Sequence, residues 1–237
     1  MRSVKGTVAV LLLVSAGACK SEREPAVLPP KGNSADSTHP VVAAADARGT
    51  VLFLGTSLTA GLGLEPDSAY PQQLQHRIDA AGLPFTTVNA GVSGETSAGL
   101  LRRLDWVLQR PAGVVVVETG ANDGLRGQPV AGTKEAIGQI LTRIKHDLPN
   151  ARVLLVQMEA PTNLGADYTR AFHAMFPALA REHGVTLLPF LLDSVAGRPS
   201  LNQADGVHPN YVGERIVTSN VWKGLEPVLR AAAGKGR

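Results

Sequence analysis

From residue 50 onward, short apolar runs alternate with longer stretches in which apolar residues recur every three or four positions. A short run bounded by turn residues is typical of a buried strand, and the longer periodicity is typical of an amphipathic helix. The short runs predict strands over residues 50–54, 86–88, 113–117, 152–156 and 185–188. The longer stretches predict helices over residues 69–81, 98–109, 133–146, 167–183 and 211–231.

Three residues bear on the boundaries of these helices. We expect Pro71 to lie in the first turn of its helix, where the N–H that proline lacks would have no partner. Thr133 is a candidate N-cap residue. Pro177 falls inside a predicted helix, and we expect it to kink or split that helix because it removes one hydrogen bond of the helix.

Strands without a polar face, each followed by a helix, predict a parallel sheet that is covered by helices on both sides. Right-handed crossovers then give an α/β fold, a three-layer α/β/α doubly wound parallel sheet of about five strands. In such a sheet, ligands bind outside the carboxyl ends of the strands. The loops after Leu54, Val88, Val117 and Val156 should therefore share one rim, and their residues are the candidates for chemistry.

The N-terminal segment predicts export. Residues 1–18 combine a positive start, an apolar run over residues 8–14 and small residues at the end, which is typical of a secretory signal peptide. The apolar run is shorter than the roughly 20 residues that span a bilayer. The sequence Ala-Gly-Ala-Cys that ends at Cys19 resembles a bacterial lipobox, with Ala16 where leucine is usual. A plain signal peptide that is cleaved nearby is the alternative.

The lipobox resemblance implies that Cys19, the only cysteine, carries a lipid that anchors the protein to a membrane. Lys20 after it resembles sorting to the outer membrane, which would leave the protein periplasmic or on the cell surface. Residues 19–48 are rich in Ser, Pro, Ala and charged residues without periodicity, and they predict a flexible tether. Residues 49–237 then form the single folded domain.

Composition and charge exclude several other classes of function. The 237 residues are 44% hydrophobic and 18% charged, which is enough to build a sizeable core. Of the formal net charge of +3, Arg2 and Lys5 belong to the predicted signal peptide, and no basic stripe with interleaved aromatic residues suggests a nucleic-acid partner. The sequence also has neither metal-ligand spacing nor a phosphate-binding Gly-Lys-Ser/Thr loop, so we expect no metal and no cofactor.

The first predicted strand leads into a turn that carries a candidate nucleophile, Ser57. A serine hydroxyl is a weak nucleophile unless a base lies within hydrogen-bond reach. Ser57 follows a buried strand and Gly55, so its hydroxyl should lie at the rim of the sheet. An N-cap serine at the start of a helix is the alternative interpretation.

The other groups needed for acyl transfer lie in three further turns. Asp205 and His208 are three residues apart, a spacing that lets the carboxylate orient the imidazole. Gly94 lets a backbone N–H approach a substrate closely, and Asn122 offers an uncharged donor. Such donors contribute roughly 3–4 kcal/mol each when they point at a developing oxyanion. Each turn taken alone could equally be ordinary turn structure.

Taken together, the order Ser, Gly, Asn and Asp-x-x-His over about residues 50–232 resembles the SGNH (GDSL-type) hydrolases, which have a flavodoxin-like sheet. Within them the chain resembles the bacterial arylesterase, acyl-CoA thioesterase I and lysophospholipase group. The resemblance implies that Ser57 is the nucleophile, that His208 is the base and that Asp205 orients it. It also implies an oxyanion hole made by Ser57, Gly94 and Asn122. Thr56 stands where the family usually has Asp.

The resemblance implies a serine esterase that acts on aryl, fatty acyl or lysophospholipid esters and on thioesters. Apolar residues within 158–164 and 190–192 could line a groove for an acyl chain. Export argues against acyl-CoA, a cytosolic metabolite, as the physiological substrate. Deacetylation of an acetylated polysaccharide and a non-catalytic surface lipoprotein that serves as a binding module are the alternatives.

Several other polar residues have structural interpretations. Ser93 is a second serine on the rim, without a partner histidine in the family pattern. Glu118 is expected to be a buried structural acid, and Asp123 to orient the loop around Asn122. Four histidines are expected on helix surfaces or at helix ends: His76, His146, His173 and His183.

Overall fold

The computed structural model describes residues 49–234, which are all but the last three residues of the predicted folded domain. The predicted signal peptide (1–18), the lipidation site Cys19 and the tether (19–48) lie outside the described residues. Within the described range, no helix has both the length and the apolar character needed to cross a bilayer.

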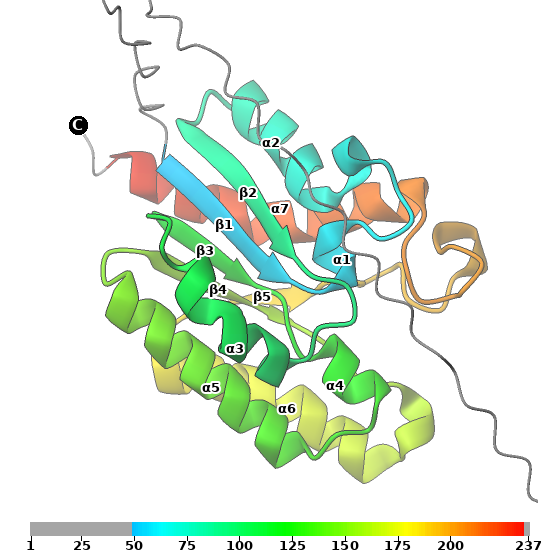
Figure 1. The fold of residues 1–237 in the computed structure, drawn as a ribbon. Coiled ribbons are helices and arrows are strands. Elements are labelled where there is room, and N and C mark those ends of the chain that lie inside the picture. The colour runs from blue at the N-terminus through cyan, green and yellow to red at the C-terminus, as the bar shows by residue number, and fades with distance from the viewer. Residues whose placement is uncertain (1–48, 235–237) are drawn as a thin grey trace, which may run out of the picture. The chain divides into compact units, whose positions relative to one another are not determined.

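A five-stranded parallel sheet forms the centre of the described domain (Figure 1). Its spatial order is β2-β1-β3-β4-β5. The strands are β1 (Gly49–Gly55), β2 (Phe85–Gly91), β3 (Val114–Val117), β4 (Arg152–Gln157) and β5 (Thr186–Phe190). This order and the parallel pairing confirm the predicted doubly wound α/β fold.

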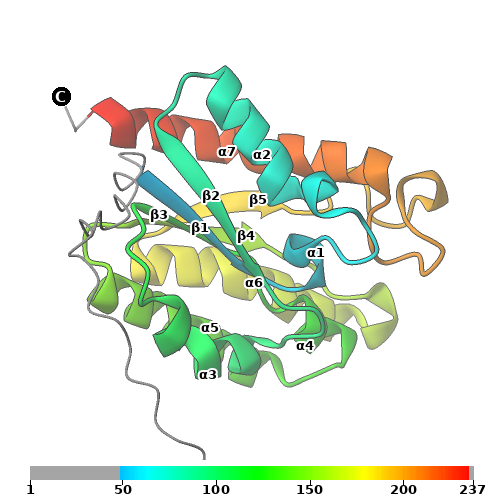
Figure 2. The same ribbon diagram turned by 45° about the horizontal axis from the view of Figure 1, so that its top comes forward.

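Helices cover both faces of the sheet. They are α1 (Ser57–Ala60), α2 (Tyr70–Ala80), α3 (Ser97–Val107), α4 (Ala121–Leu125), α5 (Val130–Asp147), α6 (Ala166–His183) and α7 (Tyr211–Ala233). Short 3-10 turns occupy Pro66–Ser68, Thr162–Leu164 and Pro199–Leu201. Helices α2 and α7 lie on one face, and α3, α5 and α6 lie on the other, as Figures 1 and 2 show together. The described domain therefore has the three layers that the sequence predicts.

The central strands are almost free of solvent. Residues 51–54, 114–117 and 154–156 are each at most 1% exposed, which explains why these segments are apolar throughout. The helices bury their apolar stripes against them, as Ile137, Ile140 and Ile144 of α5 do. This rigid centre fixes where each strand ends, and it thereby fixes the loops at the carboxyl rim.

The main differences from the sequence predictions concern one strand and two helices. Strand β2 continues to Gly91, because its residues stay in register with β1 up to the Gly55–Gly91 pair. Thr133 does not cap α5, which begins at Val130. Helix α6 runs through Pro177 without a break, so the predicted split is wrong. Buried residues on both sides of the proline, such as Phe172 and Leu179, hold this helix to the sheet. Pro71 lies in the first turn of α2, as predicted.

Candidate active site

Ser57 is the first residue of helix α1, directly beyond the carboxyl end of β1. The N-cap is Thr56, whose Oγ1 accepts the N–H of Leu58 at 3.4 Å. The interpretation of Ser57 as an N-cap is therefore wrong, and its side chain is not engaged in capping. Gly55 is required just before this turn, since a Cβ there would lie 1.9 Å from the Oγ1 of Thr59.

Beneath this turn lies Glu118, which is fully buried at the end of β3, as the sequence predicts. Its carboxylate accepts the N–H of Thr56 at 2.8 Å, the Thr56 hydroxyl at 3.0 Å and the Thr59 hydroxyl at 2.9 Å. Burial raises the pKa of Glu118, and these donors act in the opposite direction. The network ties the turn that carries Ser57 to the central strand of the sheet.

The imidazole of His208 lies between Ser57 and Asp205. Its Nε2 is 2.8 Å from the Oγ of Ser57, and its Nδ1 is 2.6 Å from the Oδ2 of Asp205. The other carboxylate oxygen of Asp205 accepts the backbone N–H groups of Val207 and His208 at 2.9 and 3.0 Å. The pKa of Asp205 is lowered to about 2, first by the backbone N–H of His208, then by its imidazole and by the N–H of Val207.

The loop that carries His208 is tied to the turn after α1 by Gln203. The Nε2 of Gln203 donates to the carbonyl oxygens of Leu62 at 2.7 Å and of Pro209 at 3.0 Å. Its backbone N–H donates to the carbonyl of His208 at 2.7 Å. A Cβ on Gly63 would lie 2.3 Å from the Oε1 of Gln203, so the turn must pass close to this amide. Sequence reasoning missed this role, because a glutamine in a polar loop carries no signal of its own.

Gly94, on the loop after β2, and Asn122, in the first turn of α4, flank the same region. Gly94 has φ +77°, a conformation that favours glycine, and its carbonyl accepts the Nη2 of Arg126 at 2.9 Å. The Nδ2 of Asn122 donates to the carbonyl of Glu95 at 3.0 Å. An amide nitrogen carries two hydrogens, so Asn122 keeps a second donor.

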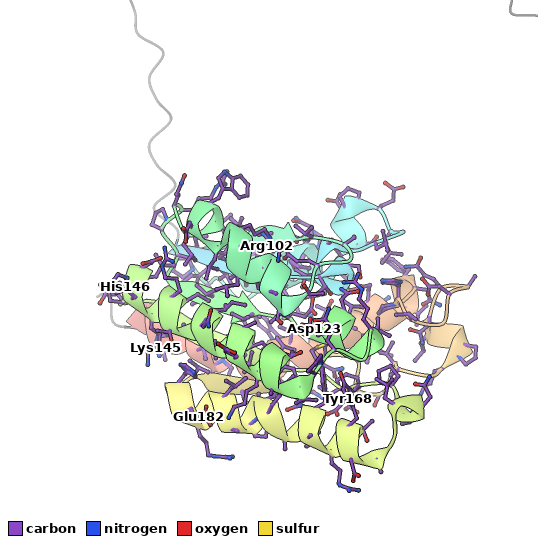
Figure 3. All side chains as sticks on the ribbon, turned by 60° about the horizontal axis from the view of Figure 1, so that its bottom comes forward. Arg102, Asp123, Lys145, His146, Tyr168 and Glu182 are labelled. Carbon is purple, nitrogen blue, oxygen red and sulfur yellow. The ribbon has the colours of Figure 1, made fainter. Side chains whose placement is uncertain are left out.

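Asp123 has a different role from the one expected. It is buried, and its carboxylate accepts the N–H of Ser97 at 2.9 Å and the Ser97 hydroxyl at 2.6 Å. The hydroxyl of Thr133 lies 3.4 Å from the same carboxylate. Figure 3 labels Asp123 beside α4. Asp123 thus joins α4 to the start of α3 and to α5, instead of acting only on the loop around Asn122.

A cleft of about 760 Å³ opens beside Ser57 and His208. Most of the side chains that line it are apolar, and they come from the loops after β1, β3, β4 and β5 and from the His208 loop: Leu58, Leu62, Leu125, Met158, Ala160, Pro161, Phe190, Leu192 and Val207. Gly94 and Asn122 also face this cleft. The segments expected to form an acyl groove therefore do lie together beside the serine.

The remaining candidates lie apart from this arrangement. The hydrogen bonds of the described residues join Ser57, and not Ser93, to a histidine. Of the four other histidines within residues 49–234, His76, His146 and His173 are exposed on helices, and His183 is half-buried at the end of α6. No group of three metal-ligating side chains occurs within residues 49–234. Nucleophilic catalysis is possible where a chain of hydrogen bonds links a serine, a histidine and an aspartate beside an apolar cleft.

Comparison with known proteins agrees with this geometry. Residues 53–216 match the model of the GDSL-like lipase/acylhydrolase family. The chain is 37% identical to esterase TesA of Pseudomonas aeruginosa over 182 residues, covering 76% of this chain and 89% of that protein. It is 39% identical to thioesterase 1/protease 1/lysophospholipase L1 of Escherichia coli over 186 residues, covering 78% and 87%.

Among solved structures, the esterase EstA from Pseudoalteromonas sp. shares 32% identity and superposes with a TM-score of 0.73. The match covers 77% of this chain and 99% of EstA. The chain therefore belongs to the GDSL-like lipase/acylhydrolase family. It is an enzyme, an esterase of the SGNH (GDSL) type. The alternative of a non-catalytic binding module finds no support among these relatives.

Proposed function

We propose that this enzyme hydrolyses carboxylic esters with Ser57 as nucleophile, His208 as general base and Asp205 as the residue that orients His208. The observation that carries the proposal is the chain of two hydrogen bonds that links Ser57 to His208 at 2.8 Å and His208 to Asp205 at 2.6 Å. A base in direct contact activates a serine, and a carboxylate on the far nitrogen fixes the tautomer that can accept the proton. The low pKa of Asp205 keeps that carboxylate ionised at neutral pH.

The reaction then has two steps. The Oγ of Ser57 attacks the ester carbonyl while the Nε2 of His208 takes the hydroxyl proton, which gives a tetrahedral oxyanion and an imidazolium. His208 returns the proton to the leaving alcohol as the carbon–oxygen bond breaks, and an acyl-enzyme remains on Ser57. Water, deprotonated by His208, attacks this ester and releases the acid. Asp205 stabilises the imidazolium in both steps.

The oxyanion is proposed to rest on the backbone N–H groups of Ser57 and Gly94 and on the side chain of Asn122. All three residues line the same cleft, which supports this assignment. The positive φ of Gly94 and the bond from Arg126 to its carbonyl hold the peptide in place. Donors fixed before the reaction stabilise the oxyanion more than donors that must reorganise.

The substrates proposed are aryl, fatty acyl and lysophospholipid esters, with thioesters as chemically related substrates. The cleft supports an acyl chain because its walls are mainly apolar and its volume of about 760 Å³ exceeds what an acetyl group needs. The relatives are named esterase, thioesterase, lysophospholipase and arylesterase. An acetylated polysaccharide would instead call for a polar wall of hydrogen-bonding side chains.

The place of action is proposed from the sequence. Residues 1–18 would direct export, and Cys19 would carry the lipid that anchors the enzyme, in the periplasm or at the cell surface. Intact mass spectrometry of the membrane-extracted protein should show residues 1–18 removed and a mass increment of acyl chains on Cys19. Cys19→Ser should abolish that increment and release the protein into the soluble fraction. An unmodified Cys19 on the mature protein would contradict the anchor and leave the esterase proposal intact.

The experiment that tests the catalytic assignment is covalent labelling with diisopropyl fluorophosphate. A serine activated by a base displaces fluoride and keeps the phosphoryl group. We expect one adduct on the peptide that contains Ser57, lost in Ser57→Ala and kept in Ser93→Ala. An adduct on Ser93, or an unlabelled Ser57 in an enzyme that hydrolyses esters, would overturn the assignment.

A further inference from the structure

Glu159 brings a carboxylate to the wall of the otherwise apolar cleft. It follows β4 closely, and its neighbours Met158 and Ala160 also line the cleft. Its side chain is 32% exposed, so it is in contact with the space that a substrate would enter. Among the described residues that line the cleft, none is a lysine or an arginine, and His208 is the other ionisable side chain.

The Glu159 carboxylate is held in a defined position. Its Oε1 accepts the Nε2 of Gln157 at 3.2 Å and lies 2.7 Å from the Nδ1 of His173, a residue of α6. Both of these hydrogen bonds engage Oε1, and no hydrogen bond between described residues engages Oε2. The side chain of His173 is 60% exposed, does not line the cleft, and forms an ion pair with Glu159 when its imidazole is protonated.

Two other charged side chains, Arg126 and Asp205, lie near the cleft without lining it. Arg126 directs its guanidinium to the carbonyl of Gly94 at 2.9 Å and is not among the lining side chains. Asp205 lies behind His208 and adds a second negative charge to the region. A substrate in the cleft therefore meets mainly apolar walls and the carboxylate of Glu159, whose field the low-dielectric walls strengthen.

From this arrangement we infer that Glu159 is a specificity-determining residue, which makes the cleft select neutral and cationic esters over anionic ones. The inference rests on the proposed esterase function and adds the charge class of its substrate. An anionic group that enters the cleft loses hydration and meets a like charge, whereas an ammonium group gains a counter-ion. Polyanionic thioesters are accordingly the poorest substrates of the thioester class, whatever their acyl chain.

The test compares esters of matched shape and different charge on the alcohol side. Butyrylcholine carries a cation, 3,3-dimethylbutyl butyrate is its neutral isostere, and the butyrate ester of 2-hydroxyethanesulfonate carries an anion. A second set places the charge at the acyl end: the methyl esters of 5-trimethylammoniopentanoate, 6,6-dimethylheptanoate and adipate. Each kcat/KM is divided by that of the neutral ester of its set, with the purified full chain at constant pH. The set that responds identifies which end of the substrate lies near Glu159.

We expect the wild-type enzyme to prefer the cation over the anion in at least one set. Glu159→Gln should reduce that cation-to-anion ratio about three- to tenfold, and Glu159→Arg should invert it. Rising salt should diminish the wild-type preference by a larger factor than that of Glu159→Gln, because the variant lacks one of the charges that salt screens. A merely structural role of Glu159 would change all three esters of a set in parallel.

Glu182→Gln is the matched control, since it removes the same charge at a position that does not line the cleft. Glu182 pairs with Lys134 and lies near the end of α6 opposite to Tyr168, as Figure 3 shows. It should leave every ratio at its wild-type value. A ratio that Glu159→Gln and Glu159→Arg both leave unchanged in both sets would overturn the inference. Failure of the wild type to hydrolyse any neutral ester would instead overturn the esterase proposal.

Discussion

The Nε2 of His208 lies 2.8 Å from the Oγ of Ser57, although 151 residues separate the two in the chain. Ser57 begins α1 and His208 lies in the loop before α7, both at the carboxyl rim of the sheet, and neither segment could set this distance alone. Glu118 holds the Ser57 turn from below, and Gln203 ties the His208 loop to the end of that turn. The hydrogen bonds of Glu118 and Gln203 therefore set the distance between His208 and Ser57 together.

Gln203→Glu tests the second anchor with almost no change of volume. The substitution replaces an amide donor by an oxygen that faces the carbonyls of Leu62 and Pro209. We expect kcat to fall at least about tenfold, with little change in KM, because a misplaced base affects the chemical step more than substrate binding. Gln109→Glu, on the exposed surface after α3, makes the same change of charge and should leave kcat unchanged. Equal kcat in both variants would rule out a positioning role for Gln203.

Asp205→Asn tests the orienting role of the carboxylate. Asparagine can still accept the N–H groups of Val207 and His208, so the loop should keep its shape. Its amide would present a donor to the Nδ1 of His208 and favour the wrong imidazole tautomer. We expect kcat to fall about hundredfold or more with a nearly unchanged melting temperature. A variant with half of the wild-type kcat would show that Asp205 does not act through His208.

Glu214 on α7 should make the stability of the enzyme depend on pH. Its side chain is 1% exposed, and within the described residues its Oε2 has no hydrogen-bond partner. Burial raises its pKa from 4.5 to about 8, against the opposing effect of the N–H of Tyr70. Because the pKa of Glu214 is higher in the folded than in the unfolded state, its contribution to the stability of the fold is complete below about pH 4.5. This contribution is lost as the pH rises towards 8.

Glu214→Gln keeps the shape of the side chain and removes the charge. The melting temperature of Glu214→Gln minus that of the wild type should be constant below pH 4.5. This difference should then increase steadily as the pH rises to about 8. Thermal unfolding from pH 4 to 9 measures this difference. Glu65→Gln, at an exposed position, serves as the control. A difference that does not vary with pH would mean that Glu214 is not held protonated by the fold.

Thr56→Asp would restore the residue usual in the family and bring a carboxyl against Glu118. In the present structure the Thr56 hydroxyl lies 3.0 Å from Glu118, whose pKa is already raised by burial. Two carboxylates at that distance cannot both ionise without a cost in free energy. The pair should therefore keep one proton at pH values where a single carboxyl group has lost it. The variant should therefore lose stability relative to wild type as pH rises from 5 to 8. The neutral variant Thr56→Asn should differ from wild type by an amount independent of pH.

The fold is predictable from the sequence where burial alone decides the pattern. The all-apolar runs of β1, β3 and β4 are buried on both faces, and their short length and their β-branched residues favour strands. The prediction for strand β2 is too short because it is an edge strand, and its polar Asn89 is typical of a loop. The predicted start of α5 is misplaced because the Thr133 hydroxyl lies against the carboxylate of Asp123 and does not cap the helix. Only the tertiary structure creates this contact.

The residues proposed for the site are accessible to sequence reasoning because each lies in a loop or in the first turn of a short helix at the rim, where the topology of the sheet brings these segments together. Their supporting contacts cannot be predicted in the same way. Gln203 bonds to a carbonyl 141 positions earlier, and Glu214 is buried only because α7 packs on α2. Neither relationship leaves a periodic or local signal in the sequence. The candidate site residues can thus be predicted from the sequence, whereas the residues that hold them in place by hydrogen bonds cannot.

The central claim is that Ser57 forms an acyl-enzyme with carboxylic esters. The direct measurement is hydrolysis of p-nitrophenyl esters from acetate to palmitate by the wild type and by Ser57→Ala, with equal folding checked by circular dichroism. We predict turnover by the wild type with an optimum beyond acetate, because the cleft is apolar and about 760 Å³ in volume. Ser57→Ala should lose at least about a thousandfold in kcat. Comparable turnover by the folded Ser57→Ala variant would contradict the claim.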